Sequence, residues 1–414
     1  MKVLWFVNIP LPAVFTYLNY KSSGSGWWLS SLADEMIKEP SIKLTIANCS
    51  SIYKSFERFE SGGIEYWLIP AKDRNINGYR CGKLIRKLAQ LVNDSDVEIV
   101  DVHGSEYFYG QVTPFVDKPV VITIQGIVNE VTKNAFGNKT FLKAVMLQTR
   151  SIQDIKSLLG MIYNYFTMLI RSKSERVILK SNSYIIGRTE RDKAITYKLN
   201  PNRRKYFVCW EIMRSEFYKT AWSYNTNQKI FASCRGGFAK GLDDLVLILP
   251  ELKNKFPHIE LRLTVNVGKN GYRGYLARLA KNLGVYERVK FLGYLTVPQV
   301  ADELKIASVF VHPSYADNSP NALAEAMCVG TPCVASAIGG IPSMIEDKYN
   351  GLLFEAGNRE QLLEKISAII SDKDLAQRLS YNARRTALER HNPAKVVRET
   401  LVAYEAVLQD RKGR

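Results

Sequence analysis

Short apolar runs alternate with amphipathic stretches along the first half of the chain. The runs are short enough to be strands buried on both faces of a sheet, and they occupy residues 2–7, 43–47, 64–69, 97–102 and 120–124. Between them, residues 27–38 and 82–93 carry apolar side chains at helical spacing. Alternation of strands and helices in this order is typical of a parallel, doubly wound sheet. The pattern therefore predicts an α/β fold.

A second alternating unit begins at Lys229. Its expected strands are residues 230–233, 261–265, 289–292, 309–312 and 332–336. Its expected helices are residues 242–253, 275–282, 297–304 and 322–329, followed by a helical tail at 375–390 and 393–409. Two such units imply two doubly wound domains that face each other across a cleft, with ligands gathered at the carboxyl ends of the strands.

A different pattern separates the two alternating units. Residues 128–180 form a long helical stretch in which lysines and arginines stand between apolar positions. Residues 200–227 lack clear periodicity and are expected to connect the domains. The expected organisation is an N-terminal domain at 1–205 that contains the basic helical insert, a C-terminal domain at 206–390, and a final helix at 391–414.

The charge of the chain is unevenly distributed. Its 57 basic and 40 acidic residues give a formal net charge of +17. The segment from Lys133 to Lys205 holds 16 basic and 4 acidic side chains, so it carries most of this excess. A local field of one sign attracts anionic partners such as phospholipid or nucleic acid, whereas the alternative interpretation is a solvated helical face.

Composition argues against several classes of protein. Hydrophobic residues make up 46% and charged residues 23%, which is a globular composition. The six cysteines have no C-x-x-C spacing and the four histidines are scattered, so we expect neither a disulfide scaffold nor a metal site. Asn8, Pro10 and Pro12 interrupt the apolar N-terminus, which favours a first strand over a signal peptide. We expect no membrane-spanning segment.

The most informative stretch runs from His312 to Pro342 and reads HPSYADNSPNALAEAMCVGTPCVASAIGGIP. Asp317 lies in a polar loop, and Glu325 lies eight residues later, inside a short expected helix. Free backbone N–H groups where a helix begins can hold a phosphate, and Glu325 can accept hydrogen bonds from two adjacent hydroxyls. The residues around this helix start, which would hold the phosphate, are Asn318, Ser319, Pro320, Asn321 and Ala322.

This stretch resembles the E-x7-E region of retaining family 4 glycosyltransferases, which have the GT-B fold of two Rossmann-like domains and a C-terminal helix that crosses back. The matching elements, in type and order, are Glu325-Ala326-Met327, Gly330-Thr331-Pro332 and Gly339-Gly340-Ile341-Pro342. The first acid is Asp317, where the family usually has Glu, so its reach is shorter by one methylene. Upstream, Arg235 and Lys240 resemble the pair with which the family neutralises a nucleotide diphosphate. Fixed cations there would stabilise the charge that grows on the leaving group.

The first half of the chain offers weaker matches. Gly24 and Gly26 precede an expected helix, where the family has a glycine loop that approaches a phosphate or acceptor; the alternative is an ordinary turn. His103 ends a strand and is expected to point towards the cleft, with a satisfied core histidine as the alternative. Gln125 ends the next strand, where relatives commonly carry a histidine that meets the donor sugar. An amide there can bind a hydroxyl but does not change charge near neutral pH.

The resemblance implies a retaining glycosyltransferase that moves a sugar from a nucleoside diphosphate, UDP or GDP, to an acceptor hydroxyl. The residues with implied catalytic roles are Arg235, Lys240, Asp317 and Glu325. Gly293 and Tyr294 stand where the family's main chain contacts the nucleobase, which does not reveal the base. No metal or other cofactor is expected, because the two cations and the helix N-terminus would neutralise the diphosphate.

Three alternatives remain open at this stage. A sugar epimerase or phosphorylase shares the GT-B architecture but fits the Asp317–Glu325 region poorly. A nucleic-acid-binding protein would use the basic segment, although that segment lacks interleaved aromatic residues and a recognition motif. A non-catalytic, membrane-associated GT-B partner subunit would keep the fold without turnover.

The basic segment also suggests where the protein works. Amphipathic helices at 128–180 are expected to lay the first domain on an anionic membrane and to lead a saccharide or lipid-linked acceptor to the cleft. The alternative is that their apolar face packs on the sheet. The expected location is the cytoplasm, at the inner face of the cell membrane, with a role in bacterial surface polysaccharide or glycolipid assembly.

Overall fold

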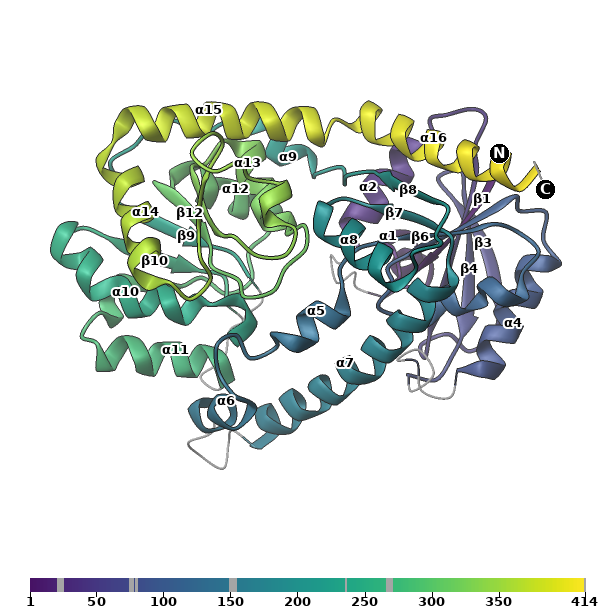
Figure 1. Cartoon of the computed structure of the whole chain (residues 1–414), viewed down its shortest axis with the longest axis horizontal. Helices are drawn as coiled ribbons and strands as arrows, with labels where there is room; N and C mark the ends of the chain where they lie inside the picture. Colours follow the sequence, from purple (N-terminus) through teal and green to yellow (C-terminus); the bar gives the residue numbers. More distant parts are fainter. Residues whose placement is uncertain are drawn as a thin grey trace. The chain divides into compact units, whose positions relative to one another are not determined.

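The computed structural model describes residues 1–20, 26–73, 78, 81–148, 155–234, 237–265 and 271–412. The chain divides into two compact units (Figure 1). Unit 1 comprises Met1–Asn129, Thr167–Ile212 and Arg390–Arg414, and unit 2 comprises Glu130–Phe166 and Met213–Glu389. The sequence predicts that the whole of 128–180 belongs to the first domain, whereas the structure groups most of that segment with the second alternating unit.

Unit 1 is built on a parallel sheet, as the alternation predicts. In the described part of the chain its strands are β1 (Lys2–Val7), β2 (Lys43–Ser50), β3 (Glu57–Ser61), β4 (Ile64–Pro70), β5 (Ile99–His103), β6 (Val120–Thr123), β7 (Tyr184–Gly187) and β8 (Lys205–Val208). Their order is β3-β4-β2-β1-β5-β6-β7-β8, and every pairing except the antiparallel β3–β4 is parallel. In the central strands β5, β6 and β7 every residue is buried, and because successive side chains of a strand point to opposite faces, the sheet is covered on both faces there.

Helices cover both faces of this sheet. They are α1 (Pro12–Tyr17), α2 (Trp27–Met36), α4 (Gly82–Asn93), the 3-10 helix η1 (Tyr109–Phe115), α8 (Glu190–Leu199) and α16 (Pro393–Lys412). Trp5 of β1 packs in a core with α2 and α16, while Leu4 and Phe6 pack in a second core with α4 and η1. The C-terminal helix is thus part of the first unit's core.

Unit 2 repeats the arrangement with a second parallel sheet. Its strands are β9 (Lys229–Ala232), β10 (Glu260–Leu263), β11 (Val289–Phe291), β12 (Val309–His312), β13 (Cys333–Ser336) and β14 (Leu352–Phe354), in the order β11-β10-β9-β12-β13-β14. Because β9 has β10 on one side and β12 on the other, the strand order reverses between β9 and β12. Ligands of open parallel sheets bind at such a reversal, outside the carboxyl ends of the strands.

The helices of unit 2 flank its sheet, with α10 on one side and α13 on the other (Figure 1). They are α9 (Ser215–Lys219), α10 (Leu242–Lys255), α11 (Gly271–Asn282), α12 (Val297–Ile306), α13 (Asn321–Val329), α14 (Arg359–Ser371) and α15 (Lys373–Arg390). Short 3-10 helices are η3 (Phe238–Lys240), η4 (Tyr286–Arg288) and η5 (Ile341–Ser343). The expected helices of the second half are all present, with boundaries shifted by a few residues.

Several elements were not expected from the sequence. The stretch at 200–227, expected as a connection, contributes β8 to the first sheet and contains α9. The strand β8 is an edge strand whose residues are only partly buried, so its sequence lacks the apolar run of a central strand. Strands β3 and β14 and helix α14 were also missed, since each of these strands is short and lies at a sheet edge.

The basic segment forms α5 (Val128–Lys133), α6 (Phe141–Gln148) and α7 (Ile155–Ser181). Ala144 of α6 is fully buried in the core of unit 2, and Arg278 of α11 donates to the Leu147 carbonyl at 2.8 Å. Lys139 forms a buried ion pair with Asp243 of α10, with Nζ and Oδ2 2.5 Å apart. These contacts fasten α6 to unit 2. Among the described residues, no helix has both the length and the apolar character needed to cross a membrane.

Candidate functional site

Asp317 is the centre of a hydrogen-bonded cluster in unit 2. It lies in the loop between β12 and α13, where its Oδ2 accepts from Lys240 Nζ at 2.5 Å and from Ser314 Oγ at 3.3 Å. His312 Nε2 lies 2.9 Å from the same oxygen. Burial alone would raise the pKa of Asp317, but the charge of Lys240 and the contact with His312 hold that pKa well below its usual range. Asp317 is therefore a carboxylate, and its Oδ1 lies outside these three contacts.

Lys240 reaches Asp317 from the neighbouring loop. It ends η3, in the loop that follows β9, whereas Asp317 lies in the loop that follows β12, so the pair lies where the strand order reverses. Burial lowers the pKa of Lys240, but the charge of Asp317 more than compensates and the pKa is raised. The structure thus brings together a fixed cation and a fixed carboxylate at the expected binding edge of the sheet.

Two glycines allow the loop that carries Asp317 to pack this closely. Gly241 has φ +64°, and a Cβ there would lie 2.1 Å from the Pro313 carbonyl oxygen. Gly339, in the Gly-Gly-Ile-Pro stretch, has φ +54°, and a Cβ would lie 1.8 Å from the Asp317 carbonyl oxygen. No side chain fits at either distance, so these glycines determine how closely the two neighbouring loops approach the Asp317 loop.

Glu325 lies in the middle of α13 and is almost fully buried. Arg214, which directly precedes α9, donates from Nη2 to Glu325 Oε1 at 2.5 Å. Burial raises the pKa of Glu325 to about 7, although the charge and hydrogen bond of Arg214 act in the opposite direction. Glu325 therefore changes between its neutral and its charged form near neutral pH, with Arg214 already in contact with one oxygen.

The polar loop ends where α13 begins. Pro320 is the residue before the helix, and its side chain makes no capping hydrogen bond. Asn318 and Ser319 are buried, while Asn321 and Ala322 in the first turn are partly exposed. Backbone N–H groups of a first helical turn have no partner within the helix and attract anions.

Several of the remaining predicted site residues lie outside the described residues or make no contact that indicates a role. Arg235 and Gly24 lie outside the described residues. Gly26 directly precedes α2 in unit 1. In unit 2, Gly293 follows β11 and is buried, whereas the next side chain, Tyr294, is 75% exposed.

His103 and Gln125 end neighbouring strands of unit 1, at β5 and just after β6, and line one small cavity. His103 is 2% exposed, packs edge-on against Trp5 with ring centroids 4.5 Å apart, and lies with Nε2 3.4 Å from Asp101 Oδ2. Among the described residues neither ring nitrogen has a hydrogen-bond partner, so His103 is not the satisfied core histidine that the sequence left as an alternative. Gln125 is partly exposed.

Two residues that the sequence does not single out lie beside predicted site residues in the structure. Arg214 lies in the stretch at 200–227, where a lone arginine without surrounding periodicity gives no signal. Tyr404 of α16 donates to Asp101 Oδ2 at 2.6 Å and accepts from Trp5 Nε1 at 3.0 Å. A buried tyrosine in a C-terminal helix is ordinary by sequence, and only the fold brings it next to the strand that ends at His103.

A comparison with protein families identifies part of the chain. The model of the family described as glycosyl transferases group 1 matches residues 215–386, which include the Asp317 cluster and Glu325. An uncharacterized glycosyltransferase of Methanocaldococcus jannaschii is 25% identical over 233 residues. That match covers 56% of this chain and 58% of the relative, so the chain spans little more than half the relative's length.

Solved structures support the fold over the whole chain. Sucrose-phosphate synthase from Thermosynechococcus elongatus superposes with a TM-score of 0.71 at 16% sequence identity, covering 99% of this chain and all of that one. HepE from Anabaena in complex with UDP-glucose superposes with a TM-score of 0.66 at 16% identity, covering 97% of this chain and 100% of that chain. At this identity the likeness concerns the fold alone, and that fold is GT-B.

Proposed function

Because residues 215–386 belong to the group 1 glycosyl transferases and the chain has the GT-B fold, we propose that it transfers a sugar from a nucleoside diphosphate sugar to an acceptor hydroxyl. One observation carries this proposal. Lys240, Asp317 and the start of α13 meet at the point where the strand order of the second sheet reverses. A cation, a carboxylate and a helix N-terminus match the diphosphate and the hydroxyls of such a donor.

Each part of the donor has a counterpart in unit 2. The backbone at 318–322 and Lys240 hold the diphosphate, with Arg235 as the second cation. Glu325 accepts hydrogen bonds from the ribose hydroxyls, and the main chain at Gly293 and Tyr294 contacts the base. UDP and GDP both fit such main-chain contacts.

The sugar that is transferred lies beyond the diphosphate. Asp317 Oδ1, which lies outside the contacts with Lys240, His312 and Ser314, accepts a hydrogen bond from one of its hydroxyls. His103 and Gln125 of unit 1, with the loop that contains Gly24 and Gly26, supply further donor contacts. An Asp here reaches less far than a Glu, which selects for a hydroxyl close to the loop.

The proposed reaction retains the anomeric configuration and needs no metal. The acceptor oxygen bonds to the anomeric carbon on the face from which the diphosphate leaves, as the bond between that carbon and the phosphate oxygen breaks. A phosphate oxygen of the leaving group takes the acceptor's proton. Lys240 and Arg235 stabilise the negative charge that grows on the diphosphate, which is the task that a metal performs in other transferases.

A donor screen tests this function before any acceptor is known. The thermal midpoint of the protein is measured with UDP-glucose, UDP-N-acetylglucosamine, GDP-mannose and ATP, each in excess EDTA. We expect the thermal midpoint to rise with one class of nucleotide sugar but not with ATP, because a ligand stabilises the state that it binds. Equal midpoints with all four compounds would contradict the proposal. With an active donor, the product's anomeric proton coupling in NMR then decides between retention and inversion.

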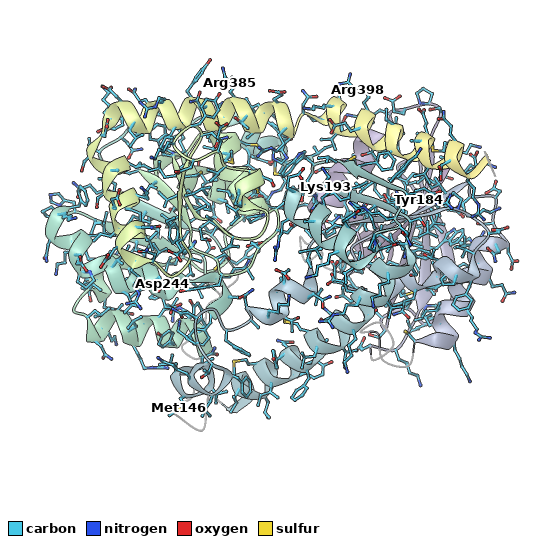
Figure 2. All side chains as sticks on the ribbon, in the orientation of Figure 1. Met146, Tyr184, Lys193, Asp244, Arg385 and Arg398 are labelled. Atoms are coloured by element: carbon cyan, nitrogen blue, oxygen red, sulfur yellow. The ribbon has the colours of Figure 1, made fainter. Side chains whose placement is uncertain are left out.

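We further propose that unit 2 contacts an anionic membrane through α6 and the start of α7. Apolar side chains lie exposed there, including Met146 on α6 (Figure 2), and the others are Phe141, Leu142, Leu159, Tyr163 and Phe166. These residues belong to unit 2, so the surface differs from the one expected on the first domain. Lys139 is unavailable to lipid because it is paired with Asp243, whereas Lys143 is exposed. Such a surface suits a lipid-linked or saccharide acceptor at the cytoplasmic face, in polysaccharide or glycolipid assembly.

Vesicle flotation tests the membrane contact. Binding is expected to rise with the fraction of anionic lipid and to fall with salt, since basic residues near an anionic surface contribute about 1 kcal/mol each. Replacing Leu142, Met146, Tyr163 and Phe166 by Gln is expected to abolish flotation. A control variant with Tyr381 and Val402 replaced by Gln alters exposed apolar residues outside this surface and is expected to float normally. No flotation of the wild type on fully anionic vesicles at low salt would favour a soluble acceptor.

A further inference from the structure

A turn of the basic segment packs directly on the loop that carries Lys240. The turn comprises residues 134–139, between α5 and α6, and it belongs to unit 2, although in the sequence it lies between β6 and β7 of the first sheet. Gly137 has φ +62°, and a Cβ there would lie 2.7 Å from the carbonyl oxygen of Phe238, the first residue of η3. The 134–139 turn therefore approaches the backbone two residues before Lys240.

Lys139 fixes the 134–139 turn at two points. Its Nζ forms the buried ion pair with Asp243 in the first turn of α10, and it lies 5.1 Å from the ring centroid of Phe238. Asp243 is held in turn by Tyr272, whose hydroxyl donates to Oδ1 at 2.8 Å. Lys139 and Asp243 are each at least nine-tenths buried, so salt screens their attraction little. Lys139 thus fastens the turn to α10 and to η3 together.

The position of η3 depends on such outside contacts. It lies between Gly237, with φ +105°, and Gly241, with φ +64°. Glycine leaves the backbone freer than any other residue does, so neither end of η3 fixes its position by itself. The anchor of η3 is Phe238, which is 2% exposed and packs edge-on against Tyr272, with ring centroids 5.0 Å apart. What packs on Phe238 therefore determines where Lys240 lies.

The 134–139 turn also supports the loop that carries Asp317. A Cβ at Gly137 would lie 3.0 Å from Cδ2 of Tyr315, two residues before Asp317. The Tyr315 backbone N–H donates to the Ala239 carbonyl at 2.7 Å, which joins this loop to η3. The two loops of the donor site are thus bonded to each other and packed against the same turn.

We infer that the 134–139 turn positions Lys240 for the transfer reaction, with Lys139 as the positioning residue. The ion pair with Asp243 holds the turn against Phe238, and Phe238 determines where the Lys240 ammonium meets the diphosphate. Lys139 acts through Lys240 rather than on the donor. The inference rests on the proposed transferase function and deepens it, because it assigns to the basic segment a role in the donor site.

A charge-neutral variant tests the ion pair. Lys139→Met/Asp243→Asn releases the turn from α10. Both charges are removed together, because removing one partner of a buried pair leaves an uncompensated charge. Arg262→Met/Glu303→Met removes another ion pair of unit 2, away from η3, and serves as the control.

A pair of glycine variants tests the same contact without changing a charge. Gly137→Ala places a methyl group against the Phe238 carbonyl, so the turn or η3 must shift. Gly284→Ala is the matched control, because its φ of +67° gives similar backbone strain but a Cβ there meets nothing within 4 Å. A loss in Gly137→Ala alone is therefore due to the contact with η3.

Nucleotide release from UDP-glucose and from GDP-mannose, measured in EDTA, gives kcat and KM for each variant, alone and combined with Lys240→Ala. We expect Lys139→Met/Asp243→Asn and Gly137→Ala each to lower kcat about tenfold and to change KM less, because a displaced charge stabilises the leaving group poorly. Both controls are expected to keep the wild-type kcat. In the Lys240→Ala background the same changes are expected to have no further effect, since they act through that side chain. Losses that multiply with Lys240→Ala would overturn the inference.

Hydrogen exchange separates this inference from the proposed function. The backbone N–H groups of Lys240 and Gly241 close η3 by donating to the carbonyls of Gly237 and Phe238. In Gly137→Ala these amides are expected to exchange about tenfold faster than in Gly284→Ala, with equal exchange in β12. Equal exchange at η3 would overturn the inference whatever the activity. A wild type that releases nucleotide from neither donor would contradict the proposed function, whereas the exchange rates still decide whether the turn holds η3.

Discussion

Arg214 Nη2 donates to Glu325 Oε1 at 2.5 Å, across 111 positions of the sequence. The contact orients a carboxylate in the middle of α13 before a ligand arrives. It also opposes the effect of burial, which raises the pKa of Glu325 to about 7. Near neutral pH, Glu325, which we assign to the ribose, is therefore present in both its neutral and its ionised form.

The affinity for UDP-glucose is expected to depend on pH through Glu325. The ribose hydroxyls donate to the ionised carboxylate, and at pH 6 only about a tenth of the groups with a pKa near 7 are ionised. Calorimetric titration is expected to show binding about eightfold to tenfold weaker at pH 6 than at pH 8. UDP-glucose is the suitable ligand, because unlike UDP it has no phosphate group that titrates in this range.

Two variants separate this explanation from a general effect of pH. The Glu325→Gln variant is expected to bind UDP-glucose weakly at both pH values, so its affinity does not change between pH 6 and pH 8. Arg214→Met removes a charge that lowers the pKa of Glu325, so its midpoint is expected to move to higher pH. A wild-type affinity that does not change between pH 6 and pH 8 would contradict an ionised Glu325 on the ribose.

Arg235→Ala and Lys240→Ala are expected to lower kcat more than they raise KM. In the proposed reaction, both charges stabilise the negative charge that grows on the diphosphate as the sugar departs, so they would contribute most in the transition state. Steady-state kinetics, with the donor identified by thermal shift, measures the separate changes in kcat and KM. Activity that is lost in EDTA and restored by a divalent metal would show that a metal, rather than these side chains, carries the role.

Gly339→Ala is expected to unfold the Asp317 loop locally and to abolish donor binding. The added Cβ would lie 1.8 Å from the Asp317 carbonyl oxygen, at a backbone φ of +54°. Gly284→Ala is the matched control: its φ is +67°, but a Cβ there meets nothing within 4 Å. The control is expected to lose about 1–3 kcal/mol from backbone strain and to keep its donor affinity. Equal donor affinities in the two variants would contradict the role of this close approach.

Tyr404→Phe is expected to destabilise unit 1 by about 1–3 kcal/mol, because it leaves Asp101 Oδ2 and Trp5 Nε1 buried without this partner. Urea unfolding followed by tryptophan fluorescence measures the change. Tyr381→Phe, at a side chain that is 66% exposed, is the control and is expected to be neutral. Equal stabilities of the two variants would show that the Asp101 contact contributes little.

The central strands and the motif helix of this protein are predictable from sequence because their signals are local. Residues 2–7 and 309–312 are strands to the residue, since an apolar run bounded by polar residues fixes both ends. Edge strands such as β3 and β8 give no such signal, because one side of the strand stays partly exposed. The sequence therefore indicates the number of domains better than it indicates the width of each sheet.

The association of α6 with unit 2 could not be predicted from periodicity. The spacing of apolar residues shows that a helix has an apolar face, but it does not show which surface covers that face. Lys139 illustrates the point: counted by sequence as one charge of a basic surface, it is buried against Asp243. The contacts of Glu325 with Arg214 and of Gln125 with Arg188 cannot be predicted from the sequence either, because each joins residues far apart in the chain.

Calorimetric titration of UDP-glucose and GDP-mannose in excess EDTA tests the central claim most directly, with wild-type protein, Glu325→Ala and the exposed control Glu287→Ala. We expect one of the two donors to bind the wild type and the control with equal affinity and to bind Glu325→Ala at least about tenfold more weakly, since a hydrogen bond to a charged group contributes about 1.5–3 kcal/mol. Failure of both donors to bind the wild type without metal, or equal affinity in a folded Glu325→Ala protein, would contradict a nucleotide-sugar site at Asp317 and Glu325.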